Sequence, residues 1–247
     1  MEFSVGNALG TSIKVWLRNF APFTLLSVLI HAPLWIWLAS ILSGDPTQGK
    51  VDDLRHYSQF GTVIGMLLNM FVTSTVTYGV VMELRGSRAS MGKSISVGLA
   101  RFLPALGVTL LSIIAATFGL VLLIVPGVIL YCMYYVSVPA SVIERPGVIG
   151  ALKRSAVLTR GDRGGIFGML LVFFFALFMV GIVIAIMTGV RDPQHQTWDG
   201  LRHQAMLNVA LEALTSTFLA VLAAVTYVQL RFSKDGASAD ELAKVFD

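Results

Sequence analysis

The sequence predicts an all-α integral membrane protein with six transmembrane helices. Of its 247 residues, 55% are hydrophobic and only 13% are charged, whereas soluble domains carry about 25% charged residues. The mean hydropathy is +0.77, and six apolar segments come close to or exceed the roughly 20 residues that cross a bilayer core about 30 Å thick. This composition excludes a soluble enzyme, a disordered chain and a disulfide-bonded secreted domain. The single cysteine, Cys132, offers neither a disulfide nor a cysteine metal cluster.

The six predicted spans cover residues 20–42, 60–82, 102–124, 128–143, 165–190 and 205–230. Only Pro126 and Gly127 separate the third span from the fourth. An unbroken helix across both would be nearly twice as long as the bilayer core is thick, at about 1.5 Å per residue. Proline removes a backbone donor and glycine permits a tight turn, so we expect a hairpin turn at these two residues. The first span is too long and starts too far into the chain for a signal peptide.

The distribution of basic residues predicts the orientation in the membrane. With six spans, 14 of the 18 lysines and arginines fall on the side that holds both termini. Cytoplasmic loops carry such an excess. We therefore expect both termini to face the cytoplasm, and this placement of the charges argues against nucleic acid as a partner.

A threefold pattern divides the chain, which we treat as a single membrane domain over residues 1–247. Apolar residues at helical spacing precede the first, third and fifth spans, over residues 5–20, 91–106 and 149–156. Basic amphipathic helices of this kind lie in the membrane interface. The alternative is that they are the first turns of the spans. The pattern predicts three hairpins, each preceded by a cytoplasmic interfacial helix, in repeat-like units 1–86, 87–147 and 148–236, unless similar membrane boundaries alone create the likeness. A short cytoplasmic helix is expected over 237–247.

Basic residues near the predicted interface are candidates for contact with lipid headgroups, most favourably anionic ones. They are Lys14, Arg18, Arg85, Arg88, Lys93, Arg101, Lys153, Arg154 and Arg160. Glu83 and Glu144 each end a span beside a cation and are expected to pair with a basic residue of an interfacial helix. The alternative is a headgroup site formed with those cations.

Polar residues inside predicted spans are costly and often functional. His31, Asn69 and Glu212 fall at similar depths in the outer half of the membrane, with Asn208 one turn from Glu212 and with Tyr134 and Tyr135 at the same level. One interpretation is an outward-facing polar pocket in which His31 and Glu212 form a proton- or cation-linked pair. The other is a satisfied buried cluster, or a glutamate that reaches outward. Trp35 fits an outer aromatic belt.

Four short segments resemble a known family when read in order. They are Leu-Ile-Val-Pro-Gly-Val-Ile-Leu (123–130), Val-Ile-Glu-Arg (142–145), Ala-Leu-Lys-Arg-Ser (151–155) and Leu-Thr-Arg-Gly (158–161). The series resembles the membrane domain fused to some bacterial glycerophosphodiester phosphodiesterases, and stand-alone YciC-like inner-membrane proteins of unknown function. The likeness covers about residues 120–165 and the tail. It implies a bacterial inner-membrane protein without catalytic residues, because the phosphodiesterase activity belongs to a separate soluble domain.

The sequence favours a non-enzymatic membrane protein. It contains no metalloprotease, serine-hydrolase, P-loop or dinucleotide-binding motif, and its scattered histidines predict neither a metal site nor a cofactor. We expect a protein that binds or organises lipid, or scaffolds partners, in envelope homeostasis, with a homo-oligomer or a membrane partner as further options. The alternative is a transporter or channel for a small solute, ion or lipid that uses the outward-facing polar pocket.

Overall fold

The structure is a computed structural model that describes residues 3–45, 47–188, 198–236 and 241. The described residues form helices and no strands. Six helical segments within them are long and apolar enough to cross a membrane. The prediction of an all-helical chain with six membrane-length segments is therefore confirmed.

The helices follow one another with short connections. They are α1 (Val5–Arg18), α2 (Phe20–Leu42), α3 (Gln48–His56), the π-helical turn η1 (Tyr57–Gly61), α4 (Thr62–Leu84), α5 (Met91–Ala100), α6 (Phe102–Leu122), α7 (Ile124–Tyr134), α8 (Ser137–Glu144), α9 (Gly147–Leu158), α10 (Arg163–Thr188) and α11 (Trp198–Asp235). Residues 189 and 190, at the end of the predicted fifth span, lie outside the described residues, as does the predicted tail helix apart from residue 241.

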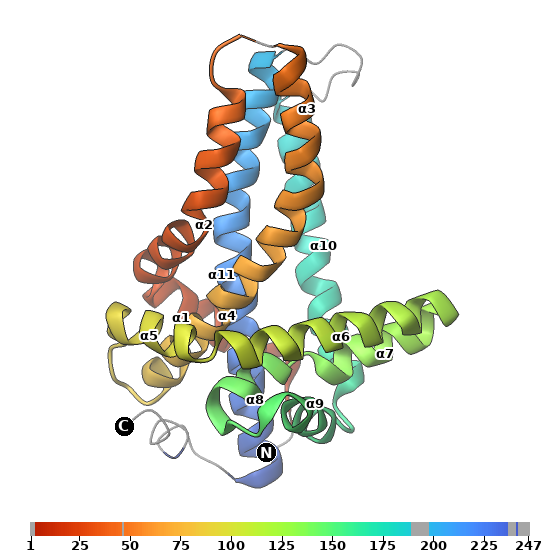
Figure 1. The fold of residues 1–247 in the computed structure, drawn as a ribbon. Coiled ribbons are helices and arrows are strands. Elements are labelled where there is room, and N and C mark those ends of the chain that lie inside the picture. The colour runs from red at the N-terminus through yellow and green to blue at the C-terminus, as the bar shows by residue number, and fades with distance from the viewer. Residues whose placement is uncertain (1–2, 46, 189–197, 237–240, 242–247) are drawn as a thin grey trace.

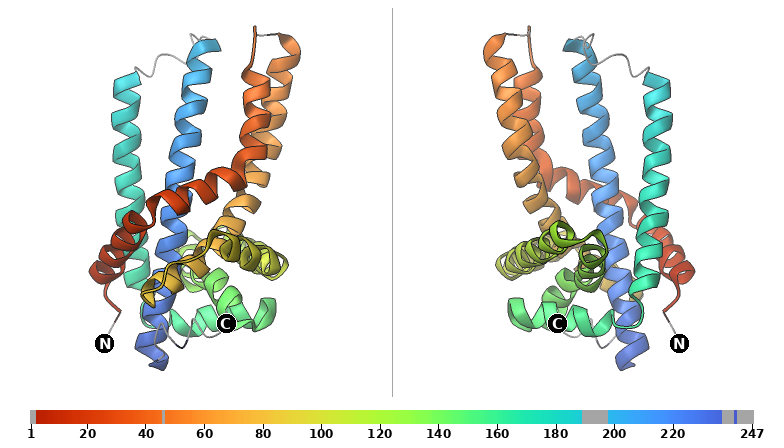
Figure 2. Two further views of the ribbon diagram at one scale, coloured as in Figure 1. Left: turned by 90° about the vertical axis from the view of Figure 1, so that its left-hand side faces the viewer. Right: turned by 90° about the vertical axis from the view of Figure 1, so that its right-hand side faces the viewer.

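Four long helices, α2, α4, α10 and α11, run along a common direction (Figures 1 and 2). We call the two ends of this upright bundle the α3 end, at the top of Figure 1, and the α9 end, at its bottom. The chain enters α1 and leaves α11 toward the α9 end. Pro33 lies inside α2, where it removes a helical hydrogen bond and favours a bend.

The helices α6 and α7 lie across the upright bundle rather than along it. Figure 1 shows them side by side and crosswise near the α9 end, and Figure 2 shows the pair nearly end-on. The sequence predicts that both run through the membrane beside the other spans, so this crosswise orientation is a difference from the prediction. Helix α9 packs below α6, where a Cβ atom on Gly107 would come within 2.8 Å of Val148 Cγ2.

The turn between α6 and α7 lies earlier than predicted. Leu123, with an extended backbone, connects the two helices, and Pro126 and Gly127 are inside the first turn and a half of α7. Proline clashes with the carbonyl group four residues before it and fits the first turn of a new helix. Pro126 therefore ends α6 at Leu122. Gly127 serves instead to let the two helices approach, because a Cβ atom there would lie 2.6 Å from the Leu120 backbone nitrogen.

A second proline interrupts the predicted fourth span. The sequence predicts one helix over residues 128–143, but the structure divides it into α7 and α8 at Tyr135 and Val136. Pro139 lies in the first turn of α8, and the carbonyl group four residues before it belongs to Tyr135. This break places Tyr134, Tyr135 and Ser137 at the junction of two short helices.

Three short helices, α1, α5 and α9, each precede a long helix, one in each predicted repeat-like unit. Helix α1 begins at Ser4, whose hydroxyl accepts a hydrogen bond from the Asn7 backbone nitrogen. Asn19 follows the last residue of α1, and Arg101 follows the last residue of α5. Both of these residues leave the helical conformation. The predicted amphipathic stripes are thus separate helices that turn away from the long helices that follow them.

The core lies where α11 meets α4, α8 and α1. Buried residues run along α11 from Ala213 to Leu230, and along α4 from Met70 to Val81. On the opposite side, only 11% of the most apolar window of α10 is buried inside the protein. The half of α11 toward the α9 end is therefore the central element, and α10 is a peripheral one.

Candidate functional site

A cavity of about 570 Å³ lies where the crosswise hairpin meets the upright bundle. Its walls come from α4, α6, the α7–α8 junction and α11. The fold creates it because α6 and α7 run across the bundle and leave a space beside α4 and α11 that no other helix fills in the part of the chain that is described. The cavity has the size of a small-molecule site.

Twelve residues that line this cavity carry a polar group, although most of the surface of its wall is hydrocarbon. Its hydroxyl, phenol, amide and carboxylate groups belong to Asn69, Thr73, Thr109, Ser112, Thr117, Tyr131, Tyr134, Tyr135, Ser137, Glu212, Thr215 and Ser216. Several of the hydroxyls donate to backbone carbonyl groups of their own helix, as Ser112 does to Val108 and Thr215 does to Leu211. Ser137 at the start of α8 donates to Tyr134 at the end of α7. Their oxygen lone pairs remain available as acceptors.

Two residues of the cavity wall carry a hydroxyl that has no hydrogen-bond partner among the described residues. They are Thr109 and Tyr135, whose Oγ1 and Oη atoms are themselves buried in the wall. A buried hydroxyl without a partner costs about 1–3 kcal/mol.

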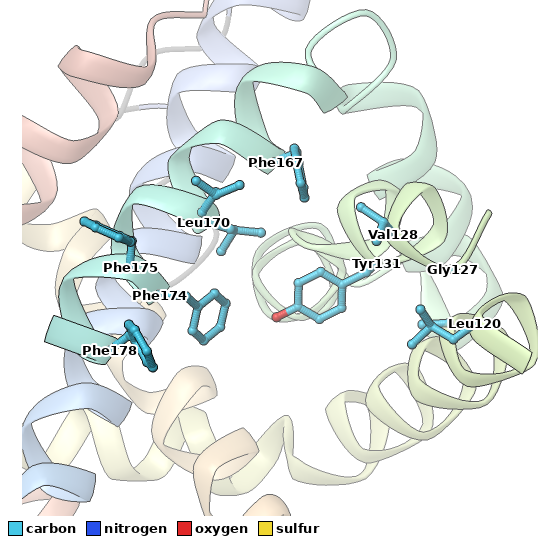
Figure 3. A pocket seen from close by; sticks show the side chains of 11 residues that line it. Leu120, Gly127, Val128, Tyr131, Phe167, Leu170, Phe174, Phe175 and Phe178 are labelled. Carbon is cyan, nitrogen blue, oxygen red and sulfur yellow. The ribbon is translucent and has the colours of Figure 1, made fainter. Parts of the chain in front are cut away.

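An apolar groove of about 500 Å³ adjoins the cavity on the α10 side. Its wall on α10 consists of Phe167, Leu170, Leu171, Phe174, Phe175 and Phe178. Figure 3 shows the Tyr131 ring reaching from the hairpin toward Phe174, with Leu120 and Val128 on the hairpin side. The side chains that line the groove are almost entirely hydrocarbon, so the groove suits an alkyl chain.

The polar cavity and the apolar groove share part of their walls. Ala116, Leu120 and Tyr131 line both. The small Ala116 side chain and the polar end of Tyr131 thus lie at the junction of a hydroxyl-rich space and a phenylalanine-lined one. Together the two spaces have the amphipathic character of a lipid, with a polar part and a hydrocarbon part.

Glu212 connects the cavity to a buried histidine on α2. Its Oε1 lies 3.7 Å from His31 Nε2, and its Oε2 accepts a hydrogen bond of 3.4 Å from Trp35 Nε1. The Glu212 side chain is 32% exposed, whereas the His31 side chain is fully buried. Gly65 of α4 provides space for the carboxylate, since a Cβ atom there would be 3.6 Å from Glu212 Oε1.

The hydrogen bonds of His31 determine where its proton lies. Nδ1 is 2.9 Å from the backbone oxygen of Ser27, and a carbonyl oxygen can only accept, so Nδ1 carries a hydrogen. Nε2 then faces the Glu212 carboxylate, and it has no hydrogen-bond partner among the described residues. The unpaired Nε2 and the Glu212 carboxylate thus face each other at a distance longer than a hydrogen bond.

The structure brings together most of the predicted intramembrane polar site. Asn69, Tyr134, Tyr135 and Glu212 line the cavity, and His31 reaches it through Glu212. Asn208 is exposed on α11 and does not line the cavity. It lies one turn from Glu212 in the sequence but does not join the site.

Sequence reasoning missed several residues of the site. Thr109 and Ser112 of α6 line the cavity and were not expected there. Tyr131 of α7, which the sequence places at the depth of Tyr134 and Tyr135, lines it as well. Trp35, expected in an aromatic belt, donates to Glu212. The available signal was the spacing of Thr109 and Ser112, which places two hydroxyls on one face of a helix that is otherwise strongly apolar.

The predicted headgroup residues divide into paired and exposed groups. Arg18 of α1 lies 3.2 Å from Glu83 of α4, and Arg154 of α9 binds Glu144 of α8 at 2.8 Å. Arg85 and Arg101 are partly buried. Besides Arg18, the exposed members of the set are Lys14, Arg88, Lys93, Lys153 and Arg160.

Glu144 is the centre of a polar cluster at the α9 end. It also accepts a hydrogen bond of 2.6 Å from the Tyr227 hydroxyl and lies 3.2 Å from Arg231. Asp235 of α11 pairs with both Arg154 and Arg231. Burial lowers the pKa of Arg154, but the hydrogen bonds and charges of Glu144 and Asp235 outweigh it and raise that pKa overall. This cluster joins α8, α9 and α11.

The described residues contain no group of three or more His, Cys, Asp or Glu side chains arranged to hold a metal ion. His56 and His203 are exposed at the α3 end, and His195 lies outside the described residues. The site therefore has the character of a binding cavity with one acid–histidine pair on its wall.

Comparison with known proteins identifies a family. The model of the family described as a domain of unknown function (DUF7847) matches residues 54–230, so the chain belongs to that family. The matched range contains every residue that lines the polar cavity, whereas His31 and Trp35 on α2 precede it. No curated protein and no solved structure matches the chain.

Proposed function

We propose that this chain is a non-enzymatic membrane protein that binds a lipid-like amphiphile in the space between its crosswise hairpin and its upright bundle. The polar part of the ligand lies in the hydroxyl-lined cavity, and its hydrocarbon part follows the phenylalanine-lined groove. By holding lipid in this way the protein organises its bilayer surroundings in envelope homeostasis.

The observation that carries the proposal is the shared wall at Ala116, Leu120 and Tyr131. Two separate pockets of opposite polarity would fit many arrangements. Two pockets that adjoin through an alanine and the polar end of a tyrosine fit a molecule with both kinds of surface.

The proposal includes a placement in the membrane. The α9 end faces the cytoplasm of a bacterial inner membrane, with both termini on that side. The exposed basic residues Lys14, Lys93 and Lys153 of α1, α5 and α9 contact anionic headgroups as interfacial helices. The support is the excess of basic residues toward this end and the resemblance to YciC-like proteins.

A substitution at the shared wall tests lipid binding. Ala116→Trp fills the junction, because Ala116 is 9% exposed and lines both spaces. The readout is native mass spectrometry from a gentle detergent, before and after stepwise delipidation. We expect lipid to remain at a fixed stoichiometry in the parent and to be lost in Ala116→Trp. The same spectra give the oligomeric state.

The matched control is Ile114→Trp on the same helix. Ile114 is 62% exposed and lines neither space, so this variant should retain lipid like the parent. Thermal unfolding of each variant shows whether it is folded. Equal lipid retention in a folded Ala116→Trp variant would contradict the proposal.

Transport of a small solute or ion is a second candidate function. The observation that favours it is the pair of His31 and Glu212, two ionisable side chains whose Nε2 and Oε1 atoms lie 3.7 Å apart within apolar helices. We expect Glu212→Gln to abolish proton-linked flux in proteoliposomes if this function is correct. Flux equal to that of the parent would exclude a role for the pair in transport.

A further inference from the structure

The charges that line the cavity restrict the ligands it can hold. Glu212 is the single carboxylate among the described lining residues, and none of those residues is a lysine, arginine or histidine. A phosphate or sulfate headgroup would therefore enter a space that offers it no cation and one negative group. Buried charges need a partner of opposite sign, so an anionic headgroup is disfavoured here.

Glu212 itself has an incomplete set of partners. It receives one hydrogen bond from Trp35, and its other oxygen faces His31 across 3.7 Å. The remainder of the carboxylate opens to the cavity, where Asn69 and Ser216 also line the wall. A positively charged group in the cavity would pair with this carboxylate, and the oxygen atoms of the surrounding hydroxyls would contact it.

Aromatic rings also favour a cation at this position. Tyr131, Tyr134 and Tyr135 all line the same cavity, and the faces of aromatic rings attract ammonium groups. Beyond Tyr131 the groove continues along Phe174 and Phe178. A single molecule could thus place its cation beside Glu212 and its alkyl chain along α10.

We propose that the cavity binds an amphiphile with an ammonium headgroup, whose cation lies beside Glu212. This inference rests on the proposed lipid-binding function and names its ligand class. The carboxylate supplies the opposite charge, the tyrosines of the hairpin supply aromatic surface, and the groove along Phe174 and Phe178 takes the alkyl chain.

The test compares three probes with the same chain on the full-length protein in nanodiscs. Radiolabelled dodecyltrimethylammonium is the cation, dodecanol the neutral probe and dodecyl sulfate the anion, each measured against empty nanodiscs. The three probes share one alkyl chain, so a difference between them reports on the charge of the headgroup. We expect the cation to bind more tightly than dodecanol, and dodecanol more tightly than the sulfate.

Glu212→Gln keeps the size of the side chain and removes its charge. We expect it to weaken binding of the cation by about 10- to 100-fold, the range for loss of a charge-assisted contact. It should leave dodecanol binding unchanged. Glu83→Gln is the matched control, because Glu83 pairs with Arg18 and does not line the cavity.

The outcomes separate this inference from the function on which it rests. If Glu212→Gln binds the cation as well as the parent does, the ammonium assignment is wrong, whether or not dodecanol binds. Loss of dodecanol binding in Ala116→Trp would then still support a lipid-binding cavity. If Ala116→Trp is folded and binds all three probes like the parent, the lipid-binding function itself is wrong.

Discussion

Arg154 and Glu144 form a two-point contact between α9 and α8, in which Arg154 Nε lies 2.8 Å from both carboxylate oxygens of Glu144. Both side chains are largely buried, at 21% and 19% exposure. The contact attaches α9 to the end of α8 and, through Asp235, to the end of α11. It therefore stabilises the packing of α9 against α8 and α11, at the end of the bundle where α9 packs below the crosswise hairpin.

Removal of the Arg154 side chain should destabilise this end of the protein. Arg154→Ala leaves Glu144 with Tyr227 and Arg231 as partners, so the loss is partial. We expect the free energy of unfolding to fall by about 1–3 kcal/mol. Thermal unfolding in detergent measures this. Lys153→Ala, at the exposed neighbour, should change stability by less than about 0.5 kcal/mol, and equal effects of the two variants would contradict the assignment.

Gly127 should be intolerant of any side chain. A Cβ atom there would lie 2.4 Å from Leu120 Cγ and 2.6 Å from the Leu120 backbone nitrogen, which cannot move aside without displacing α6. We expect Gly127→Ala to lower the free energy of unfolding by about 1–3 kcal/mol. The control is Gly181→Ala on α10, where nothing lies within 4 Å. Because alanine favours helix, that variant should be neutral or slightly stabilising.

Two tyrosine-to-phenylalanine changes should have opposite effects on stability. Tyr135→Phe removes a buried hydroxyl that has no partner, so the ligand-free protein should become more stable by up to about 1–2 kcal/mol. Tyr227→Phe removes the 2.6 Å hydrogen bond to Glu144 and should destabilise by a similar amount. Melting temperatures of delipidated samples give the comparison. A destabilised Tyr135→Phe variant would mean that its hydroxyl has a partner in the ligand-free state.

The orientation of α6 and α7 can be tested by labelling with a charged maleimide in a Cys132→Ala background. Val125→Cys lies at the tip of the hairpin, where residues 120–125 are all exposed and apolar. We expect no labelling at Val125→Cys from either side of the membrane, because the crosswise hairpin keeps its tip in hydrocarbon. Lys93→Cys should react from the cytoplasmic side, and Gln48→Cys from the other.

The result at Val125→Cys distinguishes the two arrangements. If it reacts from the same side as Gln48→Cys and equally fast, α6 and α7 cross the membrane as the hydropathy pattern predicts. Reversed sidedness of the Lys93→Cys and Gln48→Cys controls would instead overturn the proposed orientation of the termini.

The positions of the long helices could be predicted because the hydrophobic length of a span is a local property. The crosswise direction of α6 and α7 could not, since hydropathy gives length and not tilt. Their direction depends on long-range packing, such as that of Gly107 against Val148. The turn was misplaced by three residues for a stereochemical reason, because Pro126 acts on the carbonyl group four residues before it.

Depth in the membrane was sufficient to group most of the candidate site. His31, Asn69 and Glu212 lie on three different helices, and equal depth along similar helices predicted their proximity. Depth does not give the direction around each helix axis, which is why Asn208 was included and Thr109 and Ser112 were not. Those directions follow from which face of α11 and α6 packs against the bundle.

The attachment of α10 has a mechanical consequence. The helix is held near the α9 end by the buried Ile166, Met169 and Leu170, and its Phe173 ring stacks on Phe218 of α11 at 5.3 Å. From Phe174 to Ile186 none of the described side chains is buried. Side-chain packing in the protein therefore holds the described part of α10 mainly at its α9 end. Because Phe174 and Phe178 form one wall of the groove, that wall belongs to the stretch of α10 that such packing holds least.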